Sequence, residues 1–372
     1  MSNLILHPEK KSHRNGDYTG DEVMLANRNS GTLLETLHHE VTPPGAHYLL
    51  NHFDIPFVAD ASQWSLQIEG QVSQALSVNL NELINLAEEQ QLAKTLRVTL
   101  ECAGNGRALL APRWPSQPWK YEAVGTSDWH GIPLRHLLDK AKLKTSCREL
   151  VFHGTDEGID GGDIHNYARS LSVDAALHDE VMLVWQMNGQ PLLPQHGFPL
   201  RLIVPGWYGM ASVKWLNKIE AIDHAFTGHQ QVKSYIYHKE DSDEGIPVTH
   251  IRVKSLMIPP GIPDWSTRKR LVTPGTVQLT GRAWSGNGTA ISKVEWCCDD
   301  HWQEATLEPT NHKYGWTKWT ANWQANSGKH TLSCRATDAN GDTQPVDPPW
   351  DKTGFGNNAI QQLEVWVEPD PD

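Results

Sequence analysis

The spacing of apolar residues changes in character near residue 245 of this 372-residue chain. Before that point, short apolar runs that favour strands alternate with stretches whose apolar residues recur every three or four positions, as in a helix. The predicted strands cover 95–100, 150–152, 181–185 and 200–204, and the predicted helices cover 80–93 and 134–141. Proline and glycine separate these elements, so the pattern predicts a mixed α+β domain.

From residue 246 onward the helical spacing disappears, and short runs of β-forming residues follow one another between turn signals. The predicted strands are 276–279, 291–297, 318–323, 331–336 and 360–367. Short strands at this spacing are typical of a β-sandwich. Residues 1–40 are polar and lack periodicity, which predicts a surface arm. We therefore expect an arm (1–40), an α+β domain (41–245) and an all-β sandwich (246–372).

The charge balance argues against a nucleic-acid partner. The formal net charge is −12 without a clustered basic run, whereas a phosphate backbone requires a basic face. No run of apolar residues is long enough to predict a membrane span. The apolar piece at residues 4–6 is too short for a signal peptide, which predicts a cytoplasmic location. The five cysteines lack Cys-x-x-Cys spacing and are odd in number, as expected in a reducing compartment.

The strongest local signal for chemistry is the segment 95–107, TLRVTLECAGNGR. Apolar and polar residues alternate through Leu100, as in a half-buried strand, and Cys102 continues the apolar face. The glycines that follow allow positive φ angles and close approach of a ligand. A cysteine at a strand end with Arg107 nearby favours a lowered pKa and a soft ligand for a transition metal. Spacing alone leaves two alternatives open: an inert core cysteine and a redox or nucleophilic cysteine.

The stretch Glu101–Asn105 (ECAGN) resembles the cysteine signature of the sulfite oxidase family, which includes sulfite oxidases, sulfite dehydrogenases and the molybdenum domain of eukaryotic nitrate reductases. Further motifs continue the resemblance in order: NH at 51–52, GTD at 154–156 followed by Tyr167-x-x-Ser170, MNGQPL at 187–192, HGFPLR at 196–201, VPG at 204–206 and VKWL at 213–216. In the second domain, AWSG at 283–286 and RATD at 335–338 resemble the immunoglobulin-like dimerisation domain of that family. The resemblance extends over residues 41–370.

The resemblance implies an oxidoreductase with a molybdenum–molybdopterin cofactor, in which Cys102 is the one protein ligand to the metal. It also implies the residues that hold the pterin and its phosphate: Tyr48, Asn51, His52, Asp156, His196, Arg201, Ser212 and Lys214. Guanidinium, ammonium and imidazole donors suit a phosphate group, and a carboxylate suits ring N–H groups. Outside this resemblance, each of these residues is an ordinary surface charge or structural hydrogen-bonding group.

Two further positions follow from the same resemblance. Tyr235 occupies the place of the active-site tyrosine of the family, with Tyr237 as the nearby alternative, and Arg107 retains one of its substrate-side arginines. One position departs from the family. Leu50 stands directly before the Asn-His pair, where sulfite oxidases carry an arginine. If the family arginine contacts the substrate directly, leucine at this position loses a charge-assisted contact worth on the order of 1.5–3 kcal/mol. The identity of the substrate is therefore left open.

We therefore expect oxygen-atom transfer on a small anionic or oxo substrate, with sulfite oxidation to sulfate as the leading reaction. The alternatives are reduction of an oxyanion or of an S- or N-oxide, and a degenerate homologue that binds the cofactor without catalysis. No haem, flavin or nicotinamide motif is evident, since Gly104-x-Gly106 is too short for a dinucleotide loop. Electrons would then pass to an external acceptor, either a soluble carrier or dioxygen. The dimerisation domain implies a homodimer.

Overall fold

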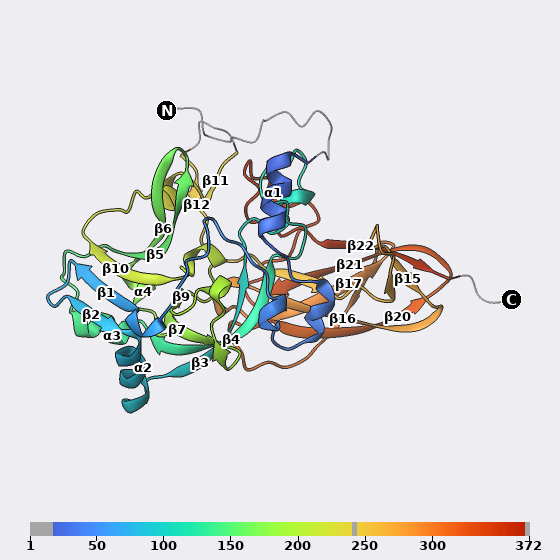
Figure 1. The fold of residues 1–372 in the computed structure, drawn as a ribbon. Coiled ribbons are helices and arrows are strands. Elements are labelled where there is room, and N and C mark those ends of the chain that lie inside the picture. Colours follow the sequence, from blue (N-terminus) through green and yellow to red (C-terminus); the bar gives the residue numbers. More distant parts are fainter. Residues whose placement is uncertain (1–17, 240–243, 369–372) are drawn as a thin grey trace.

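The computed structural model describes residues 18–239 and 244–368, and it places the second domain beside the first as the orange and red half of Figure 1. The first domain contains two sheets. One runs in the order β2 (Leu76–Asn79), β1 (Ser65–Gly70), β10 (Leu216–Ile222), β5 (Glu149–Asp160) and β6 (Asp163–Ser172). The other runs β3 (Lys94–Glu101), β4 (Val124–Pro133), β7 (Met182–Met187) and β8 (Gln190–Pro191), with β9 (Arg201–Ile203) also on β7. β1 and β10 pair in parallel, while the other pairs in these sheets are antiparallel.

The helices of this domain are short: α2 (Leu80–Glu89), α3 (Arg135–Ala141), α4 (Val173–Ala176) and α5 (His229–Val232). α2 begins where the sequence predicts because Asn79 and Glu82 form a capping box, each side chain accepting from the backbone of the other. The predicted end at residue 93 is wrong. Gln91 adopts a φ of 53°, which ends the helix and directs the chain into β3.

The second domain is a sandwich of two sheets, in agreement with the predicted fold class. One sheet runs β13 (Lys254–Met257), β16 (Gly275–Trp284), β20 (Thr317–Ala325) and β19 (Thr306–Leu307). The other runs β14 (Ile262–Pro263), β15 (Arg270–Val272), β22 (Gln361–Val367), β21 (Gly328–Asp338), β17 (Ile291–Cys298) and β18 (His301–Glu304). Leu279 and Trp319 from the first sheet pack with Leu332 and Val365 from the second in one buried cluster. A two-stranded ribbon, β11 (Ile236–Tyr237) with β12 (Ile246–Pro247), lies at the junction in sequence.

The arm predicted for residues 1–40 contains helical structure that the periodicity did not indicate, although residues 1–17 lie outside the described part. α1 (Gly20–Arg28) is nucleated by a capping box between Thr19 and Glu22. The arm then contacts the second domain, because Arg282 of β16 donates to the carbonyl oxygen of Leu37 at 2.8 Å. The predicted domain limits at residues 41, 245 and 246 stay predictions.

A buried polar cluster joins the two domains next to the strand end that carries Cys102. The carboxylate of Glu101 accepts from Lys254 Nζ of β13, from Trp284 Nε1 of β16 at 2.8 Å, and from Asn105 Nδ2 at 3.0 Å. Because every oxygen of this buried carboxylate has a donor, the cluster fixes β3 against the sandwich. Among the described helices, none is long and apolar enough to cross a bilayer.

Candidate functional site

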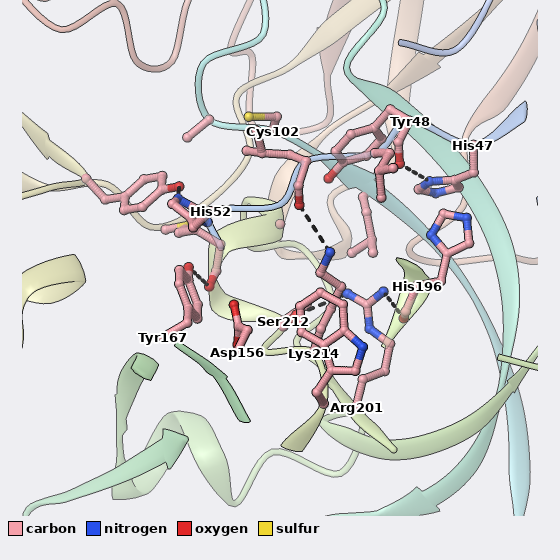
Figure 2. Close-up of a pocket in the computed structure, with 18 residues that line it drawn as sticks. His47, Tyr48, His52, Cys102, Asp156, Tyr167, His196, Arg201, Ser212 and Lys214 are labelled. Atoms are coloured by element: carbon pink, nitrogen blue, oxygen red, sulfur yellow. Dashed lines mark hydrogen bonds between the residues drawn. The ribbon is translucent and has the colours of Figure 1, made fainter. Parts of the chain in front are cut away.

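A cavity lies where β3 ends, bordered by loops of the first domain (Figure 2). Nine of the eleven residues that the sequence singles out line it: Tyr48, His52, Cys102, Asp156, His196, Arg201, Ser212, Lys214 and Tyr235. Asn51 and Arg107 do not line it. Figure 2 shows Cys102 on one side of the cavity and Asp156, Lys214 and Arg201 on the other.

Cys102 sits at the cavity because β3 ends one residue earlier. Its backbone N–H donates to Ala123 O at 2.9 Å, and its carbonyl accepts from Asn105 N at 2.9 Å across the tight turn that follows. Burial raises the pKa of the Cys102 thiol, while the nearby charge of Arg107 opposes that shift. The expectation of a lowered pKa is therefore wrong for the protein by itself. A bound metal cation is the kind of partner that deprotonates such a buried thiol.

Arg107 lies behind the Cys102 turn rather than in the cavity wall. Its Nε donates to Thr353 O at 2.7 Å, and its guanidinium covers the Phe355 ring at 5.0 Å from the centroid. A Cβ atom on Gly104 would come within 2.9 Å of that guanidinium, so only glycine allows this contact. Arg107 thus supplies positive charge near Cys102 without a direct place in the lining.

The second domain also contacts the backbone of the same turn. The Gly356 N–H donates to Ala103 O at 2.7 Å, and Asn357 Nδ2 donates to Gly106 O at 2.7 Å. The carbonyl groups of this glycine-rich turn therefore have partners from a segment some 250 positions later in the sequence. We refer to residues 353–357 as the clasp segment.

Arg201 begins β9 and lies fully within the site. It donates from its two terminal nitrogens to His196 O at 2.9 Å and to Ser212 O at 3.0 Å. Its Nε is buried and has no partner among the described residues. Burial lowers the pKa of Arg201 to about 10, which still leaves the guanidinium charged at neutral pH.

Lys214 provides the second cation of the cavity. Its Nζ donates to Leu50 O and to Gln195 O, both at 3.1 Å, and to the side-chain oxygen of Asn51. Asn51 therefore acts by orienting Lys214. Burial, together with repulsion from Arg201, holds the pKa of Lys214 well below its usual range. Within residues 18–239 and 244–368, no carboxylate forms an ion pair with either cation, so an anionic group such as a phosphate would satisfy both.

Asp156, on β5, presents the complementary group. Its Oδ1 is buried without a hydrogen-bond partner in the described structure. Burial raises the pKa of this carboxyl to about 6, although the charge of Lys214 favours the ionised form. A buried acceptor without a donor is unfavourable unless a ligand supplies one. The ring N–H groups of a pterin are donors of the kind that this oxygen lacks.

Two histidines border the Arg201 side of the cavity, with ring centroids 5.5 Å apart. His196 Nε2 lies 2.9 Å from Pro44 O, and His47 Nε2 is buried without a partner among the described residues. Burial lowers the pKa of His47 to about 4 and that of His196 to about 3. Both rings are therefore neutral near pH 7 and act as hydrogen-bonding groups rather than as additional cations.

Tyr235 faces the cavity, and Tyr237 does not. Tyr235 adopts a φ of 58°, and its hydroxyl oxygen lies 2.7 Å from His52 Nε2. The ring of Tyr237 instead packs beneath Arg252 at 4.7 Å from the centroid. Burial lowers the pKa of His52 to about 3 and raises that of Tyr235 well above its usual range. The pair is thus neutral near pH 7 and retains the phenolic proton.

Two aromatic side chains of the lining were not among the expected site residues: His47, which the sequence did not single out, and Tyr167, which belongs to the family motif Tyr167-x-x-Ser170. His47 lines the cavity and stacks on Tyr48 with centroids 5.0 Å apart. The ring centroid of Tyr167, on β6, lies 4.8 Å from that of His52, and the Tyr167 hydroxyl donates to Met210 O at 2.7 Å. His47 stands directly before Tyr48 in the sequence, and Tyr167 begins the motif Tyr167-x-x-Ser170; these were the available signals.

Two domain models match most of the chain, although His47, Tyr48 and Tyr235 of the cavity lie outside the matched ranges. Residues 52–230 match the model of the oxidoreductase molybdopterin binding domain, and residues 248–368 match the Mo-co oxidoreductase dimerisation domain. Mitochondrial sulfite oxidase of Homo sapiens is 30% identical over 354 residues, covering 88% of this chain and 62% of that protein. NADH nitrate reductase 2 of Phaseolus vulgaris is 28% identical over 371 residues, covering 90% of this chain and 40% of that protein.

The chain therefore spans less than two thirds of the length of these curated relatives. Among solved structures, the sulfane dehydrogenase SoxCD from Paracoccus pantotrophus has a TM-score of 0.77 at 22% identity. That comparison covers 97% of this chain and 92% of the other chain, so the two share a fold over both domains.

Proposed function

Because this chain belongs to the sulfite oxidase family of molybdopterin-dependent oxidoreductases, we propose that it transfers oxygen atoms, with sulfite as its leading substrate. In that reaction sulfite and water give sulfate, two protons and two electrons, and the electrons pass to an external acceptor, a soluble carrier or dioxygen. The observation that carries the proposal is the cavity itself. It combines the buried thiol of Cys102 with two cations, Arg201 and Lys214, that have no carboxylate counter-ion among the described residues.

The donor set fits the molybdenum–molybdopterin cofactor. Arg201 and Lys214 would hold its phosphate, the free Oδ1 of Asp156 would accept from the pterin ring, and Cys102 would bind the metal. When bound, this group supplies the oxygen-atom transfer and the two-electron chemistry. The chain supplies the geometry and the local charge.

Tyr235 and His52 form a neutral hydrogen-bonded pair at the cavity. The phenol retains its proton because burial raises its pKa well above its usual range, and His52 is neutral with a pKa of about 3. The hydrogen bond of 2.7 Å between them fixes the Tyr235 hydroxyl at the cavity. We infer that this hydroxyl donates to an oxygen of the substrate and that His52 orients it.

Reduction of an S- or N-oxide is the second candidate, and Leu50 favours it. Leu50 lines the cavity with an apolar side chain, while its carbonyl accepts from Lys214 Nζ. Arg107 is engaged by Thr353 O and does not reach the lining. A neutral oxo substrate is compatible with this arrangement, because it needs fewer converging cations than sulfite does.

The deciding experiment compares both directions on enzyme produced in a host that makes the cofactor. Sulfite-dependent reduction of an artificial acceptor, with about one molybdenum per chain, would support the leading proposal. Turnover only with a reduced dye plus a sulfoxide or an N-oxide would favour the second candidate, and turnover only with a reduced dye plus nitrate would favour reduction of an oxyanion. Bound cofactor without turnover in any of these assays would leave a degenerate binding protein.

Leu50→Arg tests the substrate assignment directly. If sulfite binds near this residue, the added guanidinium should lower the KM for sulfite by about tenfold or more, since a charge-assisted contact is worth about 1.5–3 kcal/mol. Leu50→Met is the matched control, because it changes the side chain without adding charge. An unchanged KM for sulfite in both variants would count against sulfite.

We also propose that the protein is a homodimer, supported by the dimerisation domain that residues 248–368 match. Sedimentation at micromolar concentration should then give twice the mass of one chain, and a strict monomer would contradict the proposal. A cytoplasmic location stays a prediction.

A further inference from the structure

The second domain carries a group of three metal-ligating side chains that the oxidoreductase site does not use. Cys298 ends β17, Asp299 follows it in the turn to β18, and His330 lies on the neighbouring strand β21. Figure 1 shows β17 and β21 within the orange and red half of the molecule. None of the three residues lines the cavity at Cys102.

The three possible ligand atoms face one another at short distances. Cys298 Sγ lies 3.7 Å from His330 Nδ1 and 3.5 Å from Asp299 Oδ2, and Nδ1 lies 2.6 Å from Oδ2. Cys298 and His330 are half-buried, while Asp299 is exposed, so an ion from solvent can reach them. The arrangement brings one sulfur, one nitrogen and one oxygen to a single point at the surface.

Two backbone contacts orient these atoms toward each other. His330 Nε2 lies 2.8 Å from the carbonyl of Asn326, which can only accept, so Nε2 carries the hydrogen. The present hydrogen bond to Asp299 Oδ2 then requires a hydrogen on Nδ1 as well, and loss of that hydrogen leaves a lone pair on Nδ1 that faces Cys298 and Asp299. The Thr331 N–H donates to the other carboxylate oxygen of Asp299, Oδ1, at 2.9 Å, which leaves Oδ2 for the same point. Backbone groups that orient the ligands in this way are typical of metal sites.

We propose that Cys298, Asp299 and His330 bind one zinc-class divalent cation. A tetrahedral zinc with bonds of about 2.3 Å to sulfur and 2.0–2.2 Å to nitrogen and oxygen requires ligand atoms about 3.4–3.6 Å apart. The two distances that involve Sγ are already close to that range. Only the distance between Nδ1 and Oδ2 has to widen, and a cation between them replaces their present hydrogen bond. Water occupies the fourth position.

The donor set selects the metal. A thiolate and an imidazole favour zinc and its analogues over calcium or magnesium, which prefer oxygen ligands only. Binding displaces the thiol proton of Cys298 and the Nδ1 proton of His330, both of which pass to solvent, so the affinity falls at low pH. The site depends on residues of the second domain alone, and its occupancy is independent of the molybdenum chemistry.

The test uses the purified holoenzyme, freed of loosely bound metal with a chelator and then titrated with Co²⁺ and Zn²⁺. We expect one Co²⁺ per chain, with the absorption band of a thiolate–cobalt bond, and displacement of that band by Zn²⁺. Cys298→Ser should abolish the band, and Asp299→Asn or His330→Gln should weaken binding on the order of 100-fold. Asp299 has a φ of 48°, a left-handed conformation that asparagine also adopts, so Asp299→Asn should not disturb the backbone.

Cys297→Ser is the matched control, because neighbouring residues of a strand point to opposite faces and Cys297 is buried. This variant should keep the cobalt band unchanged. Molybdenum content and turnover should be the same in all variants, which separates this site from the oxidoreductase function. Absence of the band in the wild-type protein, or its persistence in Cys298→Ser, would overturn the proposal.

Discussion

Glu101 and Lys254 form an ion pair across the boundary between the two domains, with 0% and 5% of their side chains exposed. Glu101 is the last residue of β3, directly before Cys102, and Lys254 begins β13. Trp284 donates to the same carboxylate from the second strand of that sheet. The position of Cys102 is therefore set in part by the sandwich domain.

Removing one partner of this pair should destabilise the protein strongly. Lys254→Ala leaves a buried carboxylate without its counter-ion, so we expect a loss of about 3–5 kcal/mol in the free energy of unfolding. Urea unfolding measures this loss. The control is Arg135→Ala, which removes an ion pair with Asp179 whose side chains are 42% and 67% exposed. That change should stay below about 1 kcal/mol, and equal losses in the two variants would contradict the argument.

Cys102→Ser should abolish turnover, because the hydroxyl is a much poorer ligand than the thiolate for a soft metal site. Molybdenum analysis should then find little metal per chain. Cys147→Ser is the control, since this half-buried free cysteine lies outside the cavity lining. Normal metal loading and normal turnover in Cys102→Ser would defeat the assignment of the metal ligand.

Tyr235→Phe should lower kcat by about 10²-fold or more, because it removes the hydroxyl that we infer donates to the substrate. Tyr237→Phe offers a matched control two residues away, since its ring packs on Arg252 outside the lining. Steady-state rates at saturating substrate separate the two variants. Equal rates in both would remove Tyr235 from the reaction.

Asp156 gives a dependence on pH with a definite sign. Its folded-state pKa is raised from 3.8 to about 6, so the folded state binds the proton more tightly than the unfolded state does. The contribution of this tighter proton binding to the free energy of unfolding is fully present below pH 3.8 and is lost as the pH rises through about 6. In protein prepared without the cofactor, the free energy of unfolding should fall by about 3 kcal/mol more than that of Asp156→Asn between acidic and neutral pH. Urea unfolding of both proteins at acidic and neutral pH tests this, and parallel pH curves would refute it.

The local pattern around residue 100 was sufficient to predict where Cys102 lies. The alternation through Leu100 predicts a strand, and β3 ends at Glu101. The neighbouring strand β4 escaped prediction because it buries polar residues. Thr126 is fully buried there, with its hydroxyl 2.6 Å from that of Thr99 on β3. Such pairs satisfy each other only after the strands meet, so the sequence of either strand gives no indication of them.

Contacts that form only on folding also limit what the sequence predicts about the site. Family motifs identify Tyr235 and His52, which lie 183 positions apart, but not the hydrogen bond between them. They also suggest a direct role for Arg107, whereas the structure engages its guanidinium with Thr353 O and the Phe355 ring. Both facts depend on tertiary contacts that local patterns do not contain.

The clasp segment, residues 353–357, has a consequence for how the enzyme is assembled. The turn after Cys102 accepts hydrogen bonds from the Gly356 N–H and from the side-chain amide of Asn357, residues that are synthesised some 250 positions after it. Until the last strands of the sandwich have folded and docked, the carbonyl groups of Ala103 and Gly106 lack these donors. We therefore expect an ordered maturation: the sandwich has to be in place before the loop after Cys102 is complete, and a chain cut short before residue 353 would offer the cofactor an unfinished site.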